Sequence, residues 1–298
     1  MAIDTGAAPT TVPEPPPQAP PKDLVMRLWR GDASGGRFQD YHVTPQEGEV
    51  VLDVVHRIQA TQAPDLAVRW NCKAGKCGSC SAEINGRPKL MCMTRMSTLP
   101  TDEPITISPM RAFPIMRDLV TDVSYNFEVA KLIPAFKPGP RDPDGLYRMA
   151  QVDIDRGQEF HKCIECFLCQ DICHVNRVHE LSGRFFGPRF FVRVASLEMH
   201  PKDVLDRREL LRERGGIALC NITKCCTEVC PEHIHITDNA IIPLKERIVD
   251  SRYDPVAWLG RKITGRPAPL RASEARKYTG AAHTQPPAAT APKPGDGA

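Results

Sequence analysis

The sequence lacks several features that would assign it to a common class of protein. No apolar run is long enough to cross a membrane, and no basic-then-apolar segment that would indicate export opens the chain. A formal net charge of +3 gives no sign of a nucleic-acid-binding surface. We find no glycine-rich dinucleotide loop, no Ser-His-Asp or Cys-His arrangement and no paired acid–base carboxylates. The chain therefore carries no visible catalytic site of its own.

The composition is that of a folded protein with two unusual ends. Of the 298 residues, 41% are hydrophobic and 25% charged, and the length suggests two domains. Prolines concentrate in residues 1–22 and 263–298, which contain few aromatic or branched apolar residues. Such segments cannot bury enough surface to offset their chain entropy. We therefore expect both ends to be disordered tails.

The first half of the folded region has the pattern of a small mixed sheet crossed by one helix. Apolar and polar residues alternate over 23–30, which predicts a strand, and Asn85-Gly86 is a strong hairpin signal within 81–93. Further elements are expected as strands at 41–44 and 105–107 and a helix at 50–59. This pattern fits a β-grasp, ubiquitin-like ferredoxin domain, which we expect over 23–122.

Helical spacing dominates the second half. It begins over 118–133, and Pro134 with the Pro/Gly-rich stretch 138–145 indicates an interdomain connection. Helices are then expected at 155–180, 188–200, 202–213 and 238–250, the last with Asp238 as its N-cap. The predicted fold class is α+β. An N-terminal β-grasp, ferredoxin-like domain precedes a mainly α-helical domain over 123–262, with disordered tails.

Twelve cysteines are the most informative feature of the sequence. Without an export signal we expect a reducing compartment, where thiolates bind metals more readily than they form disulfides. The first four have the C-x4-C-x2-C…C spacing of a plant-type [2Fe–2S] site: Cys72, Cys77, Cys80 and Cys92. Gly75 and Gly78 let the backbone wrap closely and aim N–H groups at the sulfurs. A zinc site also uses four thiolates, but usually as two separated pairs.

The other eight cysteines form two ferredoxin-type runs. The second run has Thr223 where the template has a cysteine. In two-cluster ferredoxins the fourth cysteine of each run ligates the other cluster. This crossing predicts a [4Fe–4S] site of Cys163, Cys166, Cys169 and Cys230, and a three-thiolate [3Fe–4S] site of Cys173, Cys220 and Cys226. Cys225 does not fit the template. We interpret it as a spare thiol, although as a ligand it would allow a fourth iron.

The local strings resemble the iron–sulfur subunit of succinate dehydrogenase and fumarate reductase over about 23–262. They are RWNCKAGKCGSCSAEING, LMCMT, PMRAFPIMRDLV and CIECFLCQDIC. The resemblance implies the iron–sulfur subunit of a succinate:quinone oxidoreductase, which relays single electrons from a flavoprotein to membrane quinone. It also implies FAD and quinone, with menaquinone expected, bound mainly by or with partner subunits. The implied partners are a flavoprotein and a membrane anchor, which can be of the cytochrome b type. The chain would lie peripherally at the cytoplasmic face of the cell membrane.

Departures from the family pattern gather near the expected quinone end. His174 stands where family members commonly have proline, Asn221 where histidine is frequent, and the stretch VNRVHE lacks the usual tryptophan. His174 is our candidate quinone-proximal residue, because imidazole titrates near neutral pH. The alternative is a role beside the cluster sulfur or the anchor. Segment 184–193 mixes arginines and phenylalanines, which could dock a membrane anchor or form an ordinary helix.

Other functions remain as alternatives from the sequence alone. A quinol:fumarate reductase transfers electrons in the opposite direction, from quinol to fumarate, and its iron–sulfur subunit would have the same motifs. A ferredoxin-like subunit of another flavin dehydrogenase would also carry these clusters. A zinc-stapled binding module is the alternative without redox chemistry.

Overall fold

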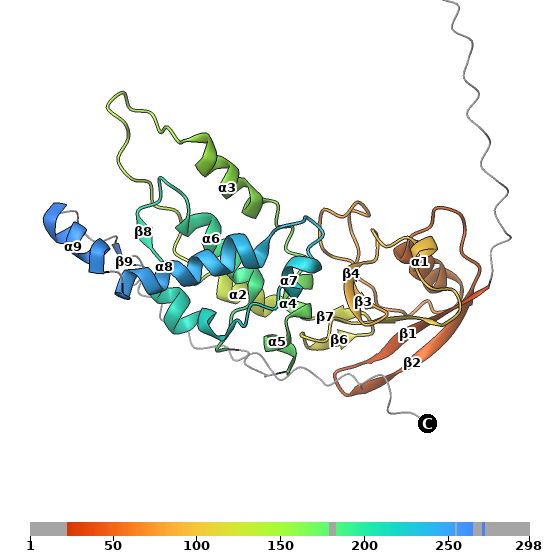
Figure 1. The fold of residues 1–298 in the computed structure, drawn as a ribbon. Coiled ribbons are helices and arrows are strands. Elements are labelled where there is room, and N and C mark those ends of the chain that lie inside the picture. The colour runs from red at the N-terminus through yellow and green to blue at the C-terminus, as the bar shows by residue number, and fades with distance from the viewer. Residues whose placement is uncertain (1–22, 179–182, 254, 265–269, 272–298) are drawn as a thin grey trace, which may run out of the picture.

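The computed structural model describes residues 23–178, 183–253, 255–264 and 270–271. Two parts lie side by side in Figure 1: a sheet-containing part formed by the N-terminal half and a helical part formed by the C-terminal half. The expected tail at 1–22 lies outside the described residues, as does the tail at 263–298 apart from residues 263–264 and 270–271. No described helix is long and apolar enough to cross a membrane.

The N-terminal part is a mixed sheet with one helix packed on it. The strands are β1 (Leu24–Asp32), β2 (Gly35–Val43), β3 (Ser81–Ile84), β4 (Arg87–Leu90), β5 (Ile105–Ser108), β6 (Ile115–Arg117) and β7 (Val120–Thr121). Their order is β4-β3-β5-β1-β6-β7, with β2 antiparallel to β1 and β5 parallel to it. The helix α1 (Val51–Thr61) buries one apolar face, made by Val51, Leu52, Val54, Val55 and Ile58. The strand, helix and hairpin positions predicted for this half are confirmed.

The β3–β4 hairpin shows how local sequence determines the register. Asn85 and Gly86 both have positive φ, at 48° and 74°. A two-residue type I′ turn requires positive φ at both central positions, which Asn-Gly tolerates well. The turn fixes the pairing of Ser81 with Leu90, which brings Cys80 and Cys92 to the same end of the hairpin.

One helix predicted across the boundary between the halves was wrong. Residues 118–133 do not form one helix; β6 and β7 make a hairpin, and α2 covers only Ser124–Ala130. Asp118 has a left-handed φ of 47°, which a continuous right-handed helix does not allow. Polar contacts of its carboxylate hold this turn in place.

The C-terminal part consists mainly of short helices. They are α3 (Gln151–His161), α4 (Leu168–Ile172), α5 (His174–Val178), α6 (Pro188–Glu198), α7 (Cys225–Glu228), α8 (Ile242–Tyr253) and α9 (Pro255–Thr264). This part also contains a 3₁₀ helix at Ile217–Leu219 and π-helical turns at Leu210–Arg214 and Ile236–Ile241. Another 3₁₀ helix, Met96–Thr98, lies in the N-terminal part. The strands β8 (Leu205–Asp206) and β9 (Leu270–Arg271) pair in parallel.

Three helix predictions for this part need correction. The helix expected over 155–180 is interrupted, because Glu165 and Phe167 adopt positive φ in the cysteine-rich loop. The stretch 202–213 begins with β8 and ends in a π-helical turn instead of forming one helix. Asp238 is not an N-cap, since it lies inside the turn Ile236–Ile241 and pairs with Lys224 at 2.7 Å.

Two hydrophobic cores are present, and one segment belongs to both parts of the chain. The first core gathers buried residues between Leu24 and Leu119, and the second gathers residues between Val129 and Leu244. Cys166, Phe167 and Leu168 come from the C-terminal half but pack in the first core. The two halves therefore share an interface at this cysteine-rich loop.

A buried ion network strengthens the same interface. The Glu83 carboxylate on β3 is 1% exposed and accepts from Arg111 at 2.8 Å and from Arg177 on α5. Arg177 also pairs with Asp171 at 3.2 Å, and Ala112 N–H donates to Asp171 at 2.9 Å. Burial, together with the Glu83 carboxylate, raises the pKa of Asp171 to about 7. These contacts join α4 and α5 to the sheet.

The proline-rich segment at 134–145 follows the C-terminal part closely. Gly139 N–H donates to Lys202 O at 2.8 Å, and Val204 N–H donates to Lys137 O at 3.1 Å. Pro138 forms an isolated bridge with Asp203. The expected interdomain connection therefore lies along the second core and does not run freely between the two cores.

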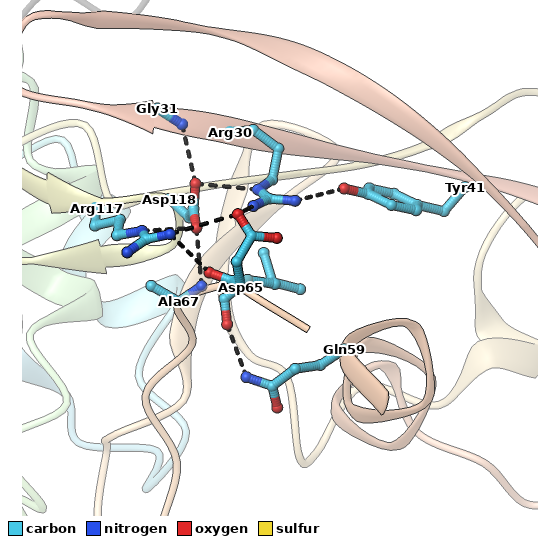
Figure 2. A network of polar contacts seen from close by, with 9 residues as sticks. Arg30, Gly31, Tyr41, Gln59, Asp65, Ala67, Arg117 and Asp118 are labelled. Carbon is cyan, nitrogen blue, oxygen red and sulfur yellow. Dashed lines mark hydrogen bonds and ion pairs between the residues drawn. The ribbon is translucent and has the colours of Figure 1, made fainter. Parts of the chain in front are cut away.

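Asp118 joins the end of β1 and the β6–β7 turn to the segment that precedes the first cysteine loop (Figure 2). Its carboxylate, 3% exposed, accepts from Gly31 N–H at 3.0 Å, Ala67 N–H at 2.8 Å and Arg30 Nε at 3.1 Å. Arg30 also donates to Tyr41 Oη at 2.7 Å. The network thereby ties β1 and the β6–β7 turn to the segment that precedes Cys72.

Replacing this carboxylate should destabilise the sheet. Asp118→Ala leaves two partly buried N–H groups and Arg30 without this acceptor, so we expect a loss of about 1–3 kcal/mol in the free energy of unfolding. Asp40→Ala is the matched control, because Asp40 also pairs with a β1 arginine but is exposed; its loss should be at most about 1 kcal/mol. Chemical denaturation of the intact protein measures both, and equal losses would contradict this role for Asp118.

Candidate metal centres

The first cysteine group lies on a loop that turns its backbone toward sulfur. Lys73, Gly75 and Gly78 have positive φ, at 55°, 68° and 68°. The loop directs the N–H groups of Ala74 and Lys76 to Cys72 Sγ, at 3.4 and 3.3 Å. Amide donors of this kind favour a charged thiolate over a neutral thiol. The loop therefore fits an anionic sulfur ligand.

The other thiols of this group lie beside the loop. Cys77 Sγ accepts from Cys72 N–H at 3.5 Å, and Cys80 Sγ accepts from Cys92 N–H at 3.5 Å. Burial, together with the nearby thiols of Cys92 and Cys77, raises the pKa of Cys80 to about 12. The structure thus brings together the four residues predicted for the first site.

The second group joins the first ferredoxin run to a distant cysteine. Burial raises the pKa of Cys166 to about 12, and the thiols of Cys163 and Cys230 lie close enough to add to it. Cys169 is fully buried, and burial raises the pKa of its thiol well above the usual value. The neighbouring thiols of Cys166, Cys163, Cys226 and Cys230 act in the same direction. Cys230 therefore lies beside a run that precedes it by more than fifty residues, where the crossing rule expects it.

The third group contains the three predicted residues and also Cys225. Burial raises the pKa of Cys173 to about 12, with Cys225 and Cys226 adding to it. Burial likewise raises the pKa of Cys226 to about 11, and Cys225 and Cys220 contribute. Cys225 is half-buried, and its Sγ lies 3.4 Å from Thr223 Oγ1. Cys225, which does not fit the spacing template, thus lies close to Cys173 and Cys226.

Two residues that depart from the family pattern, His174 and Asn221, contact each other next to this third group. The ring Nε2 of His174 contacts the side-chain amide of Asn221, and its Nδ1 lies 3.5 Å from Thr223 Oγ1. His174 directly follows Cys173 and begins α5. The histidine and the asparagine that replace common family residues are therefore partners. The sequence alone gave no sign of this pairing.

Two further features near the cysteine groups have partners within the fold. His235 Nδ1 lies 2.7 Å from Glu159, and its N–H donates to the same carboxylate. The phenylalanines of segment 184–193 are buried in the second core, and Arg189 is buried and pairs with Glu165. Of the two alternatives for this segment, a docking surface or an ordinary helix, the burial of its phenylalanines favours the helix.

In the part of the chain that the structure describes, no three His, Cys, Asp or Glu side chains are grouped to hold a single metal ion. This finding concerns one ion. The thiolates of an iron–sulfur cluster bind different irons around a sulfide core and are spread more widely.

Comparison with known families defines the class of protein. Residues 24–128 match the family described as a 2Fe-2S iron-sulfur cluster binding domain, and residues 159–234 match a 4Fe-4S dicluster domain. The chain is therefore an iron–sulfur protein with two cluster-binding domains, and the predicted α+β fold class is confirmed. A zinc-stapled module is not supported.

Individual relatives narrow the class to one family. The chain is 35% identical to the fumarate reductase iron-sulfur subunit of Mycobacterium tuberculosis, over 67% of this chain and 82% of that protein. It is 32% identical to the succinate dehydrogenase iron-sulfur subunit of Bacillus subtilis, over 57% of this chain and 68% of that protein. A chain of the Mycobacterium smegmatis Sdh1 complex in the apo form matches with a TM-score of 0.75 and 63% identity, covering 79% of this chain and 99% of that one. The chain belongs to the family of succinate dehydrogenase and fumarate reductase iron–sulfur subunits.

Proposed function

We propose that this chain is the electron-transfer subunit of a succinate:quinone oxidoreductase. In this role it relays single electrons from a flavoprotein subunit toward membrane quinone. The observation that carries the proposal is the gathering of twelve thiols into three successive groups along a chain 63% identical to a subunit of the Sdh1 complex. Clusters of different type and surroundings can provide graded potentials for one-electron steps.

The ligand assignment follows the three groups. A [2Fe–2S] cluster is held by Cys72, Cys77, Cys80 and Cys92, within a domain at 23–122. A [4Fe–4S] cluster is held by Cys163, Cys166, Cys169 and Cys230, and a [3Fe–4S] cluster by Cys173, Cys220 and Cys226, within a domain at 123–262. Each cluster supplies the chain with one-electron redox chemistry, and the surrounding thiols and N–H groups hold it.

The partners follow from the chemistry that this chain lacks. Succinate and FAD are bound by a flavoprotein subunit, and quinone, with menaquinone expected, is bound with a membrane anchor. The chain is attached peripherally at the cytoplasmic face of the membrane through that anchor. His174, held by Asn221 and Thr223 beside the third thiol group, is the quinone-proximal candidate. Imidazole can donate or accept a proton at neutral pH.

A quinol:fumarate reductase is the second candidate. It is favoured by the 35% identity to a protein named as a fumarate reductase subunit. The residues of this chain serve both directions equally, since direction depends on the quinone potential and the partner subunits.

Kinetics of the assembled complex test the proposal. We expect succinate to reduce the iron–sulfur centres of the purified complex and to support quinone reduction faster than quinol supports fumarate reduction. Both rates should be measured on one preparation. Faster fumarate reduction would favour the second candidate, and failure of both substrates to exchange electrons with the centres would contradict both.

Substitution of Cys230 tests the crossed assignment. Cys230→Ser should damage the [4Fe–4S] signal in electron paramagnetic resonance, although the residue belongs to the third run in sequence. Cys72→Ser is the matched control, because it should damage only the [2Fe–2S] signal. If Cys230→Ser removed only the three-iron signal, the crossing would be wrong.

A further inference from the structure

The first and second thiol groups touch through backbone atoms at Gly78. A Cβ atom added to Gly78 would lie 2.5 Å from the Cα of Cys166 and 2.9 Å from its N. Real Cβ contacts essentially never become so short, and the atoms in the way are backbone that cannot swing aside. The absence of a side chain at Gly78 is therefore what lets the two loops meet.

The side chain of Ser81 also links Gly78 to Cys166. Its buried hydroxyl lies 2.8 Å from Gly78 O and 2.9 Å from Cys166 O, so a single donor faces carbonyls of both loops. An ion pair between Lys76 and Glu232, at 2.9 Å, joins the first loop to the segment just after Cys230. The Gly78 contact and the Ser81 hydroxyl thus connect the two loops, and the Lys76–Glu232 pair ties the first loop to the segment beside Cys230.

We propose that Gly78 is a positioning residue for electron transfer, and that electrons cross from the first to the second thiol group at the Gly78–Cys166 contact. The inference rests on the proposed function, since it requires both groups to hold clusters. Cys77 is the neighbour of Gly78 in the chain, so the path between a thiol of one group and a thiol of the other contains a single non-bonded step. Electron tunnelling slows exponentially with distance, and most steeply across non-bonded gaps.

The step itself changes no bonds. With clusters bound at both thiol groups, one electron lost by the [2Fe–2S] centre would be gained by the [4Fe–4S] centre, so the electron count would balance. No proton or other reactant is needed. The role of this chain is to keep the gap short.

Gly48 is the matched control for Gly78. Both glycines have a left-handed φ, 78° at Gly48 and 68° at Gly78, so alanine strains the backbone at each. A Cβ at Gly48 would meet no heavy atom within 4 Å, and Gly48 lies outside the cysteine loops. The two variants therefore differ in whether the added methyl group reaches Cys166.

The experiment compares Gly78→Ala and Gly48→Ala in the assembled complex. With both centres reduced, magnetic interaction between them broadens the electron paramagnetic resonance signals and falls steeply with their separation. We expect this interaction to weaken in Gly78→Ala and to persist in Gly48→Ala. Hydrogen exchange of the backbone over 163–169 should also be faster in Gly78→Ala, because the loops no longer pack closely.

The same data separate the possible outcomes. An interaction and an exchange rate equal in the two variants would overturn the proposal. If either glycine variant lacks the [2Fe–2S] signal, Ser81→Ala gives the result instead: a weakened interaction supports the contact as the crossing point, and an unchanged one contradicts it. Iron and sulfide content of the unmodified complex tests the proposed function separately.

Discussion

The structure depends on keeping two cysteine-rich loops, each attached to its own hydrophobic core, in direct contact. Cys166, Phe167 and Leu168 leave the helical part to pack in the core of the sheet. The buried network around Glu83 adds charged hydrogen bonds across the same interface. Breaking a buried ion pair leaves an uncompensated charge, so this interface resists partial opening. The path between the thiol groups is thereby fixed by the fold.

Burial of the thiols disfavours their charged form unless a positive charge lies beside them. Desolvation raises the pKa values of Cys166 and Cys173 to about 12, so an unpaired thiolate is disfavoured there. On the proposed ligand assignment, iron would supply the positive charge that such thiolates need and would release their protons. In the more exposed first loop, the N–H groups of Ala74 and Lys76 point at Cys72 Sγ. Cluster binding would consequently be coupled to correct packing.

The sequence predicted those features that depend on short-range spacing. Cysteine intervals identified the three thiol groups, and Asn85-Gly86 identified the hairpin that aligns Cys80 with Cys92. Features that depend on tertiary contacts were missed. The apolar spacing over 155–180 could not reveal that Glu165 and Phe167 would adopt left-handed conformations, because the periodicity on either side continues through them.

Long-range pairings were equally hidden from the sequence. The phenylalanines of 184–193 have the composition of a docking surface but pack inside the second core. Gly78 was expected to serve its own loop, whereas a Cβ added there would meet Cys166 in the other half of the chain. His174 and Asn221 each departed from the family pattern, and only the fold brings them together.

The central claim, that the chain is an iron–sulfur relay, is tested most directly by metal and sulfide analysis of anaerobically purified protein, together with electron paramagnetic resonance. The three ligand sets predict about nine iron atoms per chain, acid-labile sulfide, and a three-iron signal in the oxidised sample. About ten irons without that signal would make Cys225 a ligand and change the last step of the relay. Zinc in place of iron, with no sulfide, would contradict the account.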